Sequence, residues 1–198
     1  MTGPSGRERD AGPSASNGPS APRASGPRRV LLVGMMGAGK STVGRRLADR
    51  LGWTLLDSDA EVEWAVGKTV PEIFAESGEA AFRRAEAMAL AEATSSERPV
   101  VIAVAGGAVL DPANRELIKR GGLVVWLRAS VATLARRVGD GDGRPLLENG
   151  AEAALARLYP QRHDLYAEVA DLVVDVDGGG PDATVEAILG KMSNTCTS

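Results

Sequence analysis

The sequence has one cysteine, no excess of positive charge and no long apolar run. Each of these features argues against a class of function. The lone cysteine, Cys196, cannot form an intramolecular disulfide, which is typical of proteins in a reducing compartment. The formal net charge is -3, so no general basic field indicates nucleic-acid binding. No apolar run reaches the roughly 18 residues of a membrane span, and the N-terminus has no signal-peptide core. These features predict a cytoplasmic protein that binds neither nucleic acid nor a membrane.

The length of 198 residues suits one domain flanked by a tail at each end. Residues 1–27 are mostly Gly, Pro, Ser and Ala, and they contain no Leu, Ile, Val or aromatic residue. Because such a segment cannot offset its ordering entropy by burial, we predict a disordered N-terminal tail. The folded domain is predicted over residues 28–192, and residues 193–198 form a predicted C-terminal tail.

Five short apolar runs alternate with segments of helical periodicity in the predicted domain. The expected strands lie within RRVLLVG, WTLLDSD, VVIAVA, LVVWLRA and DLVVDVDG. Apolar strands that alternate with helices form a parallel sheet with helices on both faces. We therefore predict an α/β fold of three layers around a five-stranded parallel sheet. Ligands of such sheets bind beyond the carboxyl ends of the strands, so we expect the functional site there.

The segment GMMGAGKS, residues 34–41, matches the P-loop pattern at every specified position. It follows a predicted strand and opens a predicted helix, which is the context that this pattern requires. Its backbone N–H groups and the helix N-terminus can surround phosphates. Lys40 should reach the β- and γ-phosphates of ATP, and Ser41 should bind Mg²⁺. The predicted ATP-binding residues of this segment are Gly37, Ala38, Gly39, Lys40, Ser41 and Thr42. Because no N-K-x-D guanine motif is present and the domain is too small for a motor ATPase, a compact kinase is favoured.

Two aspartates, Asp57 and Asp59, stand at the carboxyl end of the second predicted strand. If the extended backbone continues that far, the strand period of two places both side chains on the same face. One carboxylate can then hold Mg²⁺ while the other accepts a hydrogen bond from an attacking hydroxyl. A helix start is the alternative interpretation of Asp59, because aspartate favours helix N-termini.

Several segments together resemble the shikimate kinase family of P-loop kinases, which are similar to nucleoside monophosphate kinases. These segments are GMMGAGKSTVGRRLADRLG, LLDSD, IFAESGEAAFRRAE, AGGAVL, RRVGDGDGRPLL and RHDLY, and they occur in the family's order. The resemblance covers the chain from residue 28 to the last predicted helix. It implies a P-loop kinase fold with a substrate-binding region and a mobile lid. It also implies a monomer that transfers the γ-phosphoryl group of ATP to the 3-hydroxyl of shikimate in aromatic amino-acid biosynthesis.

The resemblance assigns roles to both aspartates and to two arginines. Asp57 matches a residue that helps to position Mg²⁺, and Asp59 matches the residue that binds the substrate hydroxyls and is the candidate base. Arg83 and Arg162 match the arginines that bind the substrate carboxylate, a role that suits the planar guanidinium group. Glu86 follows Arg83 by one helical turn and is expected to orient it.

Two glycine-containing segments complete the predicted site. In GDGDGRPLLENG, residues 139–150, Arg144 matches the lid arginine that closes onto the phosphates. Arg137, just before this segment, matches an arginine that stacks on adenine. The predicted catalytic residues are therefore Lys40, Asp59 and Arg144.

The segment AVAGGAVLD, residues 103–111, interrupts an apolar strand with two glycines. Gly106 and Gly107 match the last two positions of a Gly-Gly-Gly motif at the substrate site, and Ala105 replaces the first glycine. Glycine there lets the backbone approach the substrate closely. The departure at Ala105 leaves the substrate open. Aminoshikimate and gluconate are alternative substrates, and a nucleotide-binding paralogue without catalysis is a third alternative.

Overall fold

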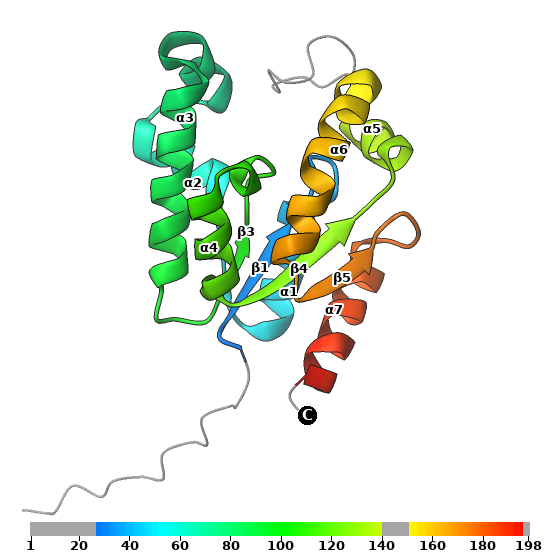
Figure 1. Ribbon diagram of the computed structural model, residues 1–198. Helices are drawn as coiled ribbons and strands as arrows, with labels where there is room; N and C mark the ends of the chain where they lie inside the picture. The colour runs from blue at the N-terminus through cyan, green and yellow to red at the C-terminus, as the bar shows by residue number, and fades with distance from the viewer. Residues whose placement is uncertain (1–26, 140–150, 196–198) are drawn as a thin grey trace, which may run out of the picture.

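The computed structural model describes residues 27–139 and 151–195, which form a five-stranded parallel sheet in the order β2-β3-β1-β4-β5 (Figure 1). The strands are β1 (Arg29–Val33), β2 (Thr54–Asp57), β3 (Val100–Ala103), β4 (Leu123–Arg128) and β5 (Leu172–Asp175). Every neighbouring pair of strands in this sheet is parallel. The predicted sheet is therefore confirmed.

Helices cover both faces of the sheet, as predicted. The helices are α1 (Lys40–Leu51), α2 (Ser58–Val66), α3 (Val70–Ser95), η1 (Ala108–Leu110), α4 (Pro112–Gly121), α5 (Val131–Val138), α6 (Ala151–Val169) and α7 (Pro181–Thr195). Helices α1 and α7 contact each other on one face, whereas α4 and α6 pack on the other face (Figure 1). Helices α2 and α3 pack against each other, and α3 also contacts α4. None of the helices in residues 27–139 and 151–195 combines the length and apolar character needed to cross a bilayer.

The sheet order determines which loops become neighbours at the site. Strands β1, β3 and β4 are apolar along most of their length because helices bury both faces of the sheet. The P-loop follows β1, the two aspartates lie at the end of β2, and residues 105–107 follow β3. Because β3 lies between β2 and β1, these three segments meet at the carboxyl edge of the sheet.

The backbone at the end of β2 differs from the extended geometry considered for the sequence. The strand ends at Asp57, and α2 begins at Ser58. The Asp57 carboxylate caps this helix by accepting a hydrogen bond from the backbone N–H of Asp59 at 3.2 Å. A short polar side chain at this position satisfies a helical amide that otherwise has no partner. The two aspartates are therefore related by a helix start rather than by the period of a strand.

Helix α3 has both a defined start and a bend. Thr69 and Glu72 form a capping box, with the backbone N–H of Thr69 donating to Glu72 Oε2 at 2.7 Å. Gly78 interrupts the helical backbone at φ 74°, a conformation that favours glycine. The bend separates the start of α3 from the longer part that carries Arg83 and Glu86.

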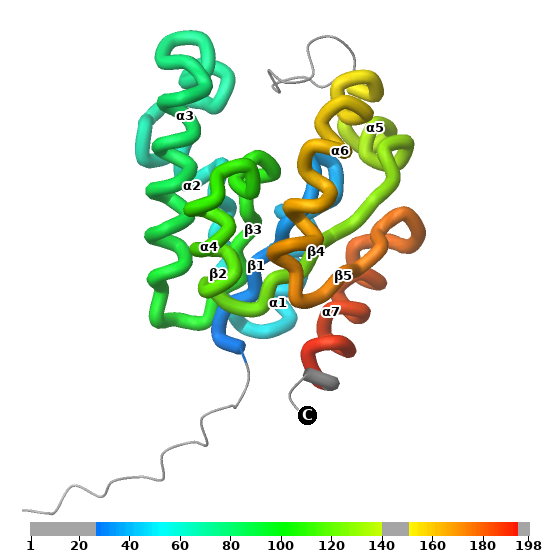
Figure 2. The backbone as a smooth tube through the Cα atoms, in the orientation of Figure 1, coloured from blue at the N-terminus to red at the C-terminus, as the bar shows by residue number. Residues whose placement is uncertain are grey.

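Both ends of the described chain lie on the side of the sheet opposite to the carboxyl ends of the strands (Figure 2). The predicted N-terminal tail, apart from residue 27, lies outside the described residues, as do residues 196–198 of the predicted C-terminal tail. The predicted lid, with Arg144, also lies outside them, apart from Gly139.

Candidate active site

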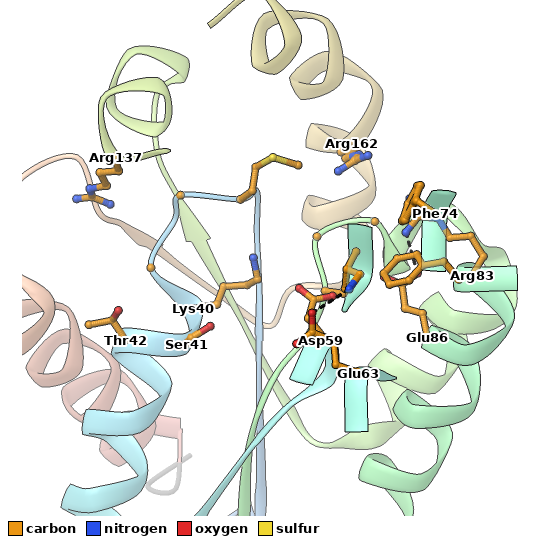
Figure 3. A pocket seen from close by; sticks show the side chains of 18 residues that line it. Lys40, Ser41, Thr42, Asp59, Glu63, Phe74, Arg83, Glu86, Arg137 and Arg162 are labelled. Carbon is orange, nitrogen blue, oxygen red and sulfur yellow. Dashed lines mark hydrogen bonds and ion pairs between the residues drawn. The ribbon is translucent and has the colours of Figure 1, made fainter. Parts of the chain in front are cut away.

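A pocket of about 600 Å³ lies where the loops after β1, β2 and β3 meet, and it collects most of the predicted site residues (Figure 3). Those that line it are Gly37, Gly39, Lys40, Ser41, Thr42, Asp59, Arg83, Gly106, Gly107, Arg137 and Arg162. Ala38 instead lines a smaller adjoining pocket of about 170 Å³, which shares Arg137 with the first. Asp57 does not line either pocket but contacts Ser41.

The P-loop has the geometry of an anion-binding helix start. Gly39 is the N-cap of α1 with φ 93°, and no side chain caps this helix. The first amides of α1 therefore point towards the pocket without a side-chain acceptor, and the helix dipole adds partial positive charge. Lys40 donates hydrogen bonds from Nζ to the carbonyl oxygens of Gly34 and Met35 at 2.9 and 3.2 Å. Its ammonium group is thus held against the loop that would surround the phosphates.

Ser41 and Asp57 bring two oxygen ligands together beside the P-loop. The Ser41 hydroxyl donates to Asp57 Oδ2 at 2.5 Å. Among the described residues, no group of three or more His, Cys, Asp or Glu side chains could hold a metal ion. Mg²⁺ differs from metals that need such clusters, because it commonly binds through one or two protein oxygens together with phosphates and water. The oxygen pair beside the P-loop fits this kind of site.

Asp59 occupies the first turn of α2, and its carboxylate lies between Lys40 and Arg83 in the pocket (Figure 3). Burial raises the pKa of the Asp59 carboxyl, and the nearby Asp57 and Glu63 act in the same direction. The Lys40 ammonium and the Arg83 guanidinium oppose this rise in the pKa. The side chain is open to the pocket, yet the surrounding protein limits its hydration. A carboxylate with a raised pKa is a better proton acceptor than an ordinary surface aspartate.

Arg83 is held by two carboxylates on α3. Its Nη1 donates to Glu86 Oε2 at 2.9 Å, which confirms the expected pair, and its Nη2 donates to Glu79 Oε1 at 3.0 Å. Glu86 is only 1% exposed. Burial raises the pKa of the Glu86 carboxyl, whereas the Arg83 guanidinium lowers it. The guanidinium also lies 5.3 Å from the ring centroid of Phe82, which forms part of the pocket wall.

Arg162 enters the same pocket from α6. It is only 2% exposed, and its buried Nε has no hydrogen-bond partner among the described residues. A buried guanidinium with an unused donor favours an anionic ligand. The adjacent His163 does not line the pocket, and its ring instead packs edge-on against Trp126 with centroids 5.0 Å apart. Arg83 and Arg162 therefore bring two guanidinium groups to one cavity from different helices.

Residues 105–107 line the same pocket. The backbone N–H of Ala105 donates to Ser58 Oγ at 2.7 Å, and the carbonyl of Gly106 accepts a hydrogen bond from the Tyr166 hydroxyl at 2.6 Å. Gly107 has φ -90°, which any residue can adopt, so its backbone conformation does not require glycine. The lack of space for a side chain favours glycine instead. A Cβ atom at Gly107 would clash with the Arg83 guanidinium. The backbone at Gly107 thus lies close to a side chain of the site, and its close approach to the substrate stays a prediction.

Replacing Gly107 by alanine is expected to raise the KM for an acidic substrate by about tenfold or more, because the methyl group would displace Arg83. The melting temperature should change little, since the displaced atoms are the end of a flexible side chain. Steady-state kinetics and thermal unfolding check both parts. Gly190→Ala is the matched control, because a Cβ atom there meets open space. An unchanged KM in Gly107→Ala would show that the position of Arg83 does not matter for binding.

The smaller pocket contains residues that the sequence analysis missed. It is lined in part by Val176 and by the glycine-rich segment 179–181, which follow β5. Arg137 donates from Nη2 to the Val176 carbonyl at 2.5 Å, so this segment also orients the predicted adenine-binding arginine. The available signal was the run DGGGP directly after a predicted strand, at the carboxyl edge where ligands bind.

Comparison with known proteins decides the family. The model of the shikimate kinase family matches residues 36–193. The chain belongs to the shikimate kinase family. The shikimate kinase of Paramagnetospirillum magneticum is 47% identical over 163 residues, which cover 82% of this chain and 83% of that protein. The kinase class and the family resemblance inferred from the sequence are therefore confirmed.

Solved structures agree with this membership. The shikimate kinase from Acinetobacter baumannii in complex with shikimate is 40% identical, with a TM-score of 0.83, and the match covers 86% of this chain and 95% of that one. A gluconokinase from Sinorhizobium meliloti is 22% identical with a TM-score of 0.58, over 85% of this chain and 93% of that one. The second match shows the common P-loop kinase fold alone.

Proposed function

We propose that this chain transfers the γ-phosphoryl group of ATP to the 3-hydroxyl of shikimate, giving shikimate 3-phosphate and ADP. The observation that carries the proposal is the division of one pocket into two sides (Figure 3). Arg137 and the P-loop lie on the nucleotide side, and Arg83 and Arg162 lie on the other. Lys40 and Asp59 lie between the two sides, where the phosphoryl group would pass.

Each side chain has a defined part in the proposed reaction. Arg83 and Arg162 bind the carboxylate of shikimate and thereby orient its ring. Asp59 accepts a hydrogen bond from the 3-hydroxyl, whose oxygen attacks the γ-phosphorus. The new bond joins this oxygen to phosphorus, the bond from phosphorus to the β–γ bridging oxygen breaks, and the hydroxyl proton passes to the Asp59 carboxylate. Lys40 stabilises the charge on the transferring group and on the ADP oxygens.

Ser41 and Asp57 are the residues that would hold Mg²⁺, directly or through water. When bound, Mg²⁺ neutralises phosphate charge and orients the phosphates for in-line transfer. The 2.5 Å contact between the two side chains keeps both oxygens at the base of the P-loop. Arg144, the proposed lid arginine, lies outside the described residues, so its contribution rests on the family resemblance alone.

The walls of the substrate side favour a carbocyclic acid over an open-chain one such as gluconate. Phe74 and Phe82 line the pocket, and their ring centroids are 4.9 Å apart. This apolar wall can cover one face of a ring, whereas an open-chain polyol has no apolar face and would lose hydration there.

The experiment that tests the proposal measures ADP release with ATP and Mg²⁺ and, in turn, shikimate, quinate, aminoshikimate and gluconate. We expect strong release with shikimate and little with the others. Strong release with aminoshikimate or gluconate instead would assign the chain to that acid and would identify Ala105 as the first position to exchange. Tight ATP binding without ADP release for any acid would indicate a non-catalytic nucleotide-binding protein.

A further inference from the structure

Tyr166 is a buried hydroxyl-bearing residue that the reaction described above does not use. It lies on α6, one turn after Arg162, and it is 1% exposed. Its hydroxyl donates to the Gly106 carbonyl at 2.6 Å and lies 3.7 Å from the Met35 sulfur. Burial raises the pKa of the Tyr166 hydroxyl, although the neighbouring Arg162 lowers it. The group therefore stays protonated and remains a hydrogen-bond donor at every pH at which the enzyme would work.

Ser58 holds the same turn from the other side. It is 2% exposed, and its Oγ accepts the backbone N–H of Ala105 at 2.7 Å. Ser58 is the first residue of α2 and directly precedes Asp59. Two buried hydroxyls, from residues far apart in the sequence, thus form hydrogen bonds with consecutive residues of one short backbone segment.

The turn of residues 105–107 consequently touches each element that carries a proposed substrate-binding side chain. Ser58 connects it to α2 and Asp59, and Tyr166 connects it to α6 and Arg162. On the third side Gly107 lies directly against the Arg83 guanidinium of α3. Movement of the turn would therefore disturb the relative positions of the carboxylate and both guanidinium groups.

We propose that the Ser58 and Tyr166 hydroxyls are positioning groups that hold the 105–107 turn and, through it, set the spacing of Asp59, Arg83 and Arg162 for the acidic substrate. This role rests on the proposed function and adds two residues that do not themselves react. The P-loop keeps its own hydrogen bonds, from Lys40 Nζ to the Gly34 carbonyl and from the Ala38 N–H to the Met35 carbonyl. Loss of either hydroxyl should therefore weaken shikimate binding and leave ATP binding unchanged.

The test compares Tyr166→Phe and Ser58→Ala with the wild-type protein by calorimetric titration of shikimate and ATP and by steady-state kinetics. Each variant should raise the Kd and KM for shikimate by about tenfold, the effect of one lost hydrogen bond in a buried site. The Kd for ATP should stay within about twofold of the wild-type value. Tyr159→Phe is the matched control, because it removes the same atom from the same helix at a residue whose ring packs against His163 instead of holding the 105–107 turn.

The outcomes separate a positioning role from a purely structural one. Lower melting temperatures with unchanged shikimate binding in both variants would overturn the proposal, as would equal losses of shikimate and ATP affinity. If Tyr166→Phe does not fold, Ser58→Ala decides, because it tests the same turn from the opposite side. Wild-type protein without shikimate-dependent ADP release would overturn the proposed function itself. Active wild-type protein with both variants indistinguishable from it would overturn only the role of the two hydroxyls.

Discussion

Replacing Lys40 by alanine is expected to lower kcat with shikimate by about a thousandfold or more, with little change in melting temperature. Lys40 Nζ lies against the P-loop carbonyls and close enough to Asp59 to influence its pKa. It therefore lies beside the proposed path of the phosphoryl group. Without it, the charge that develops during transfer loses a preorganised partner. The loss should appear in kcat because this charge is larger in the transition state than in bound ATP.

Lys119→Ala is the matched control for this variant, because Lys119 pairs with Glu168 on the surface and does not line the pocket. Coupled assays of ADP release at saturating shikimate and ATP measure kcat, and thermal unfolding measures stability. A rate for Lys40→Ala within about tenfold of the wild type would remove Lys40 from the chemistry. A large fall in melting temperature would instead show that its hydrogen bonds to the P-loop carbonyls support the fold.

The parts of this structure that could be predicted from the sequence are those with local signals. The P-loop is recognised because glycine spacing, a preceding strand and a following helix are all local. The Thr69 capping box is likewise a pattern of four residues, and the structure contains it. The alternation of strands and helices predicted the parallel sheet, but the strand order depends on packing between distant segments. That order is what makes β2, β3 and β1 neighbours at the site.

The parts that could not be predicted are contacts between distant segments. Ser58 and Tyr166 hold residues that are 47 and 60 positions away, respectively, and no spacing rule relates them. Asp59 shows a different limit of prediction from the sequence. Its position in the pocket was expected from the alternation of a strand, yet it reaches the pocket from a helix start capped by Asp57. The structure has the helix start that was the alternative interpretation, and both geometries place Asp59 at the same edge of the sheet. Its part in the reaction stays a prediction.

Two carboxylates of the site, Asp59 and Glu86, lower the stability of the protein without substrate. Burial raises the pKa of both carboxyl groups despite the cations beside them. A raised pKa means that the folded protein binds the proton more tightly than the unfolded chain does. Ionisation as the pH rises through the raised pKa therefore removes stability. At neutral pH the desolvation of both carboxylates therefore lowers the stability of the empty protein, although Arg83 pairs with Glu86. A bound substrate hydroxyl would give Asp59 a hydrogen-bond donor.

This reasoning leads to opposite effects of Asp59→Asn on activity and on stability. Turnover with shikimate should fall by about 10²- to 10⁴-fold, because the amide cannot accept the hydroxyl proton. The melting temperature at neutral pH should equal or exceed that of the wild type, because the amide carries no charge whose hydration the surrounding protein limits. The difference in melting temperature should shrink as the pH falls through the raised pKa of Asp59, where the wild-type carboxyl is also neutral.

The pH dependence of the wild type provides an independent measurement of the same group. Its kcat/KM should fall on the acid side with a midpoint above the ordinary aspartate pKa of about 3.9. Asp49→Asn, on the exposed face of α1, is the matched control and should change neither the rate nor the pH profile. A near-normal rate for Asp59→Asn would exclude this carboxylate as the proton acceptor. A clear loss of stability at neutral pH would show instead that its attraction to Lys40 and Arg83 outweighs the effect of burial, which the raised pKa argues against.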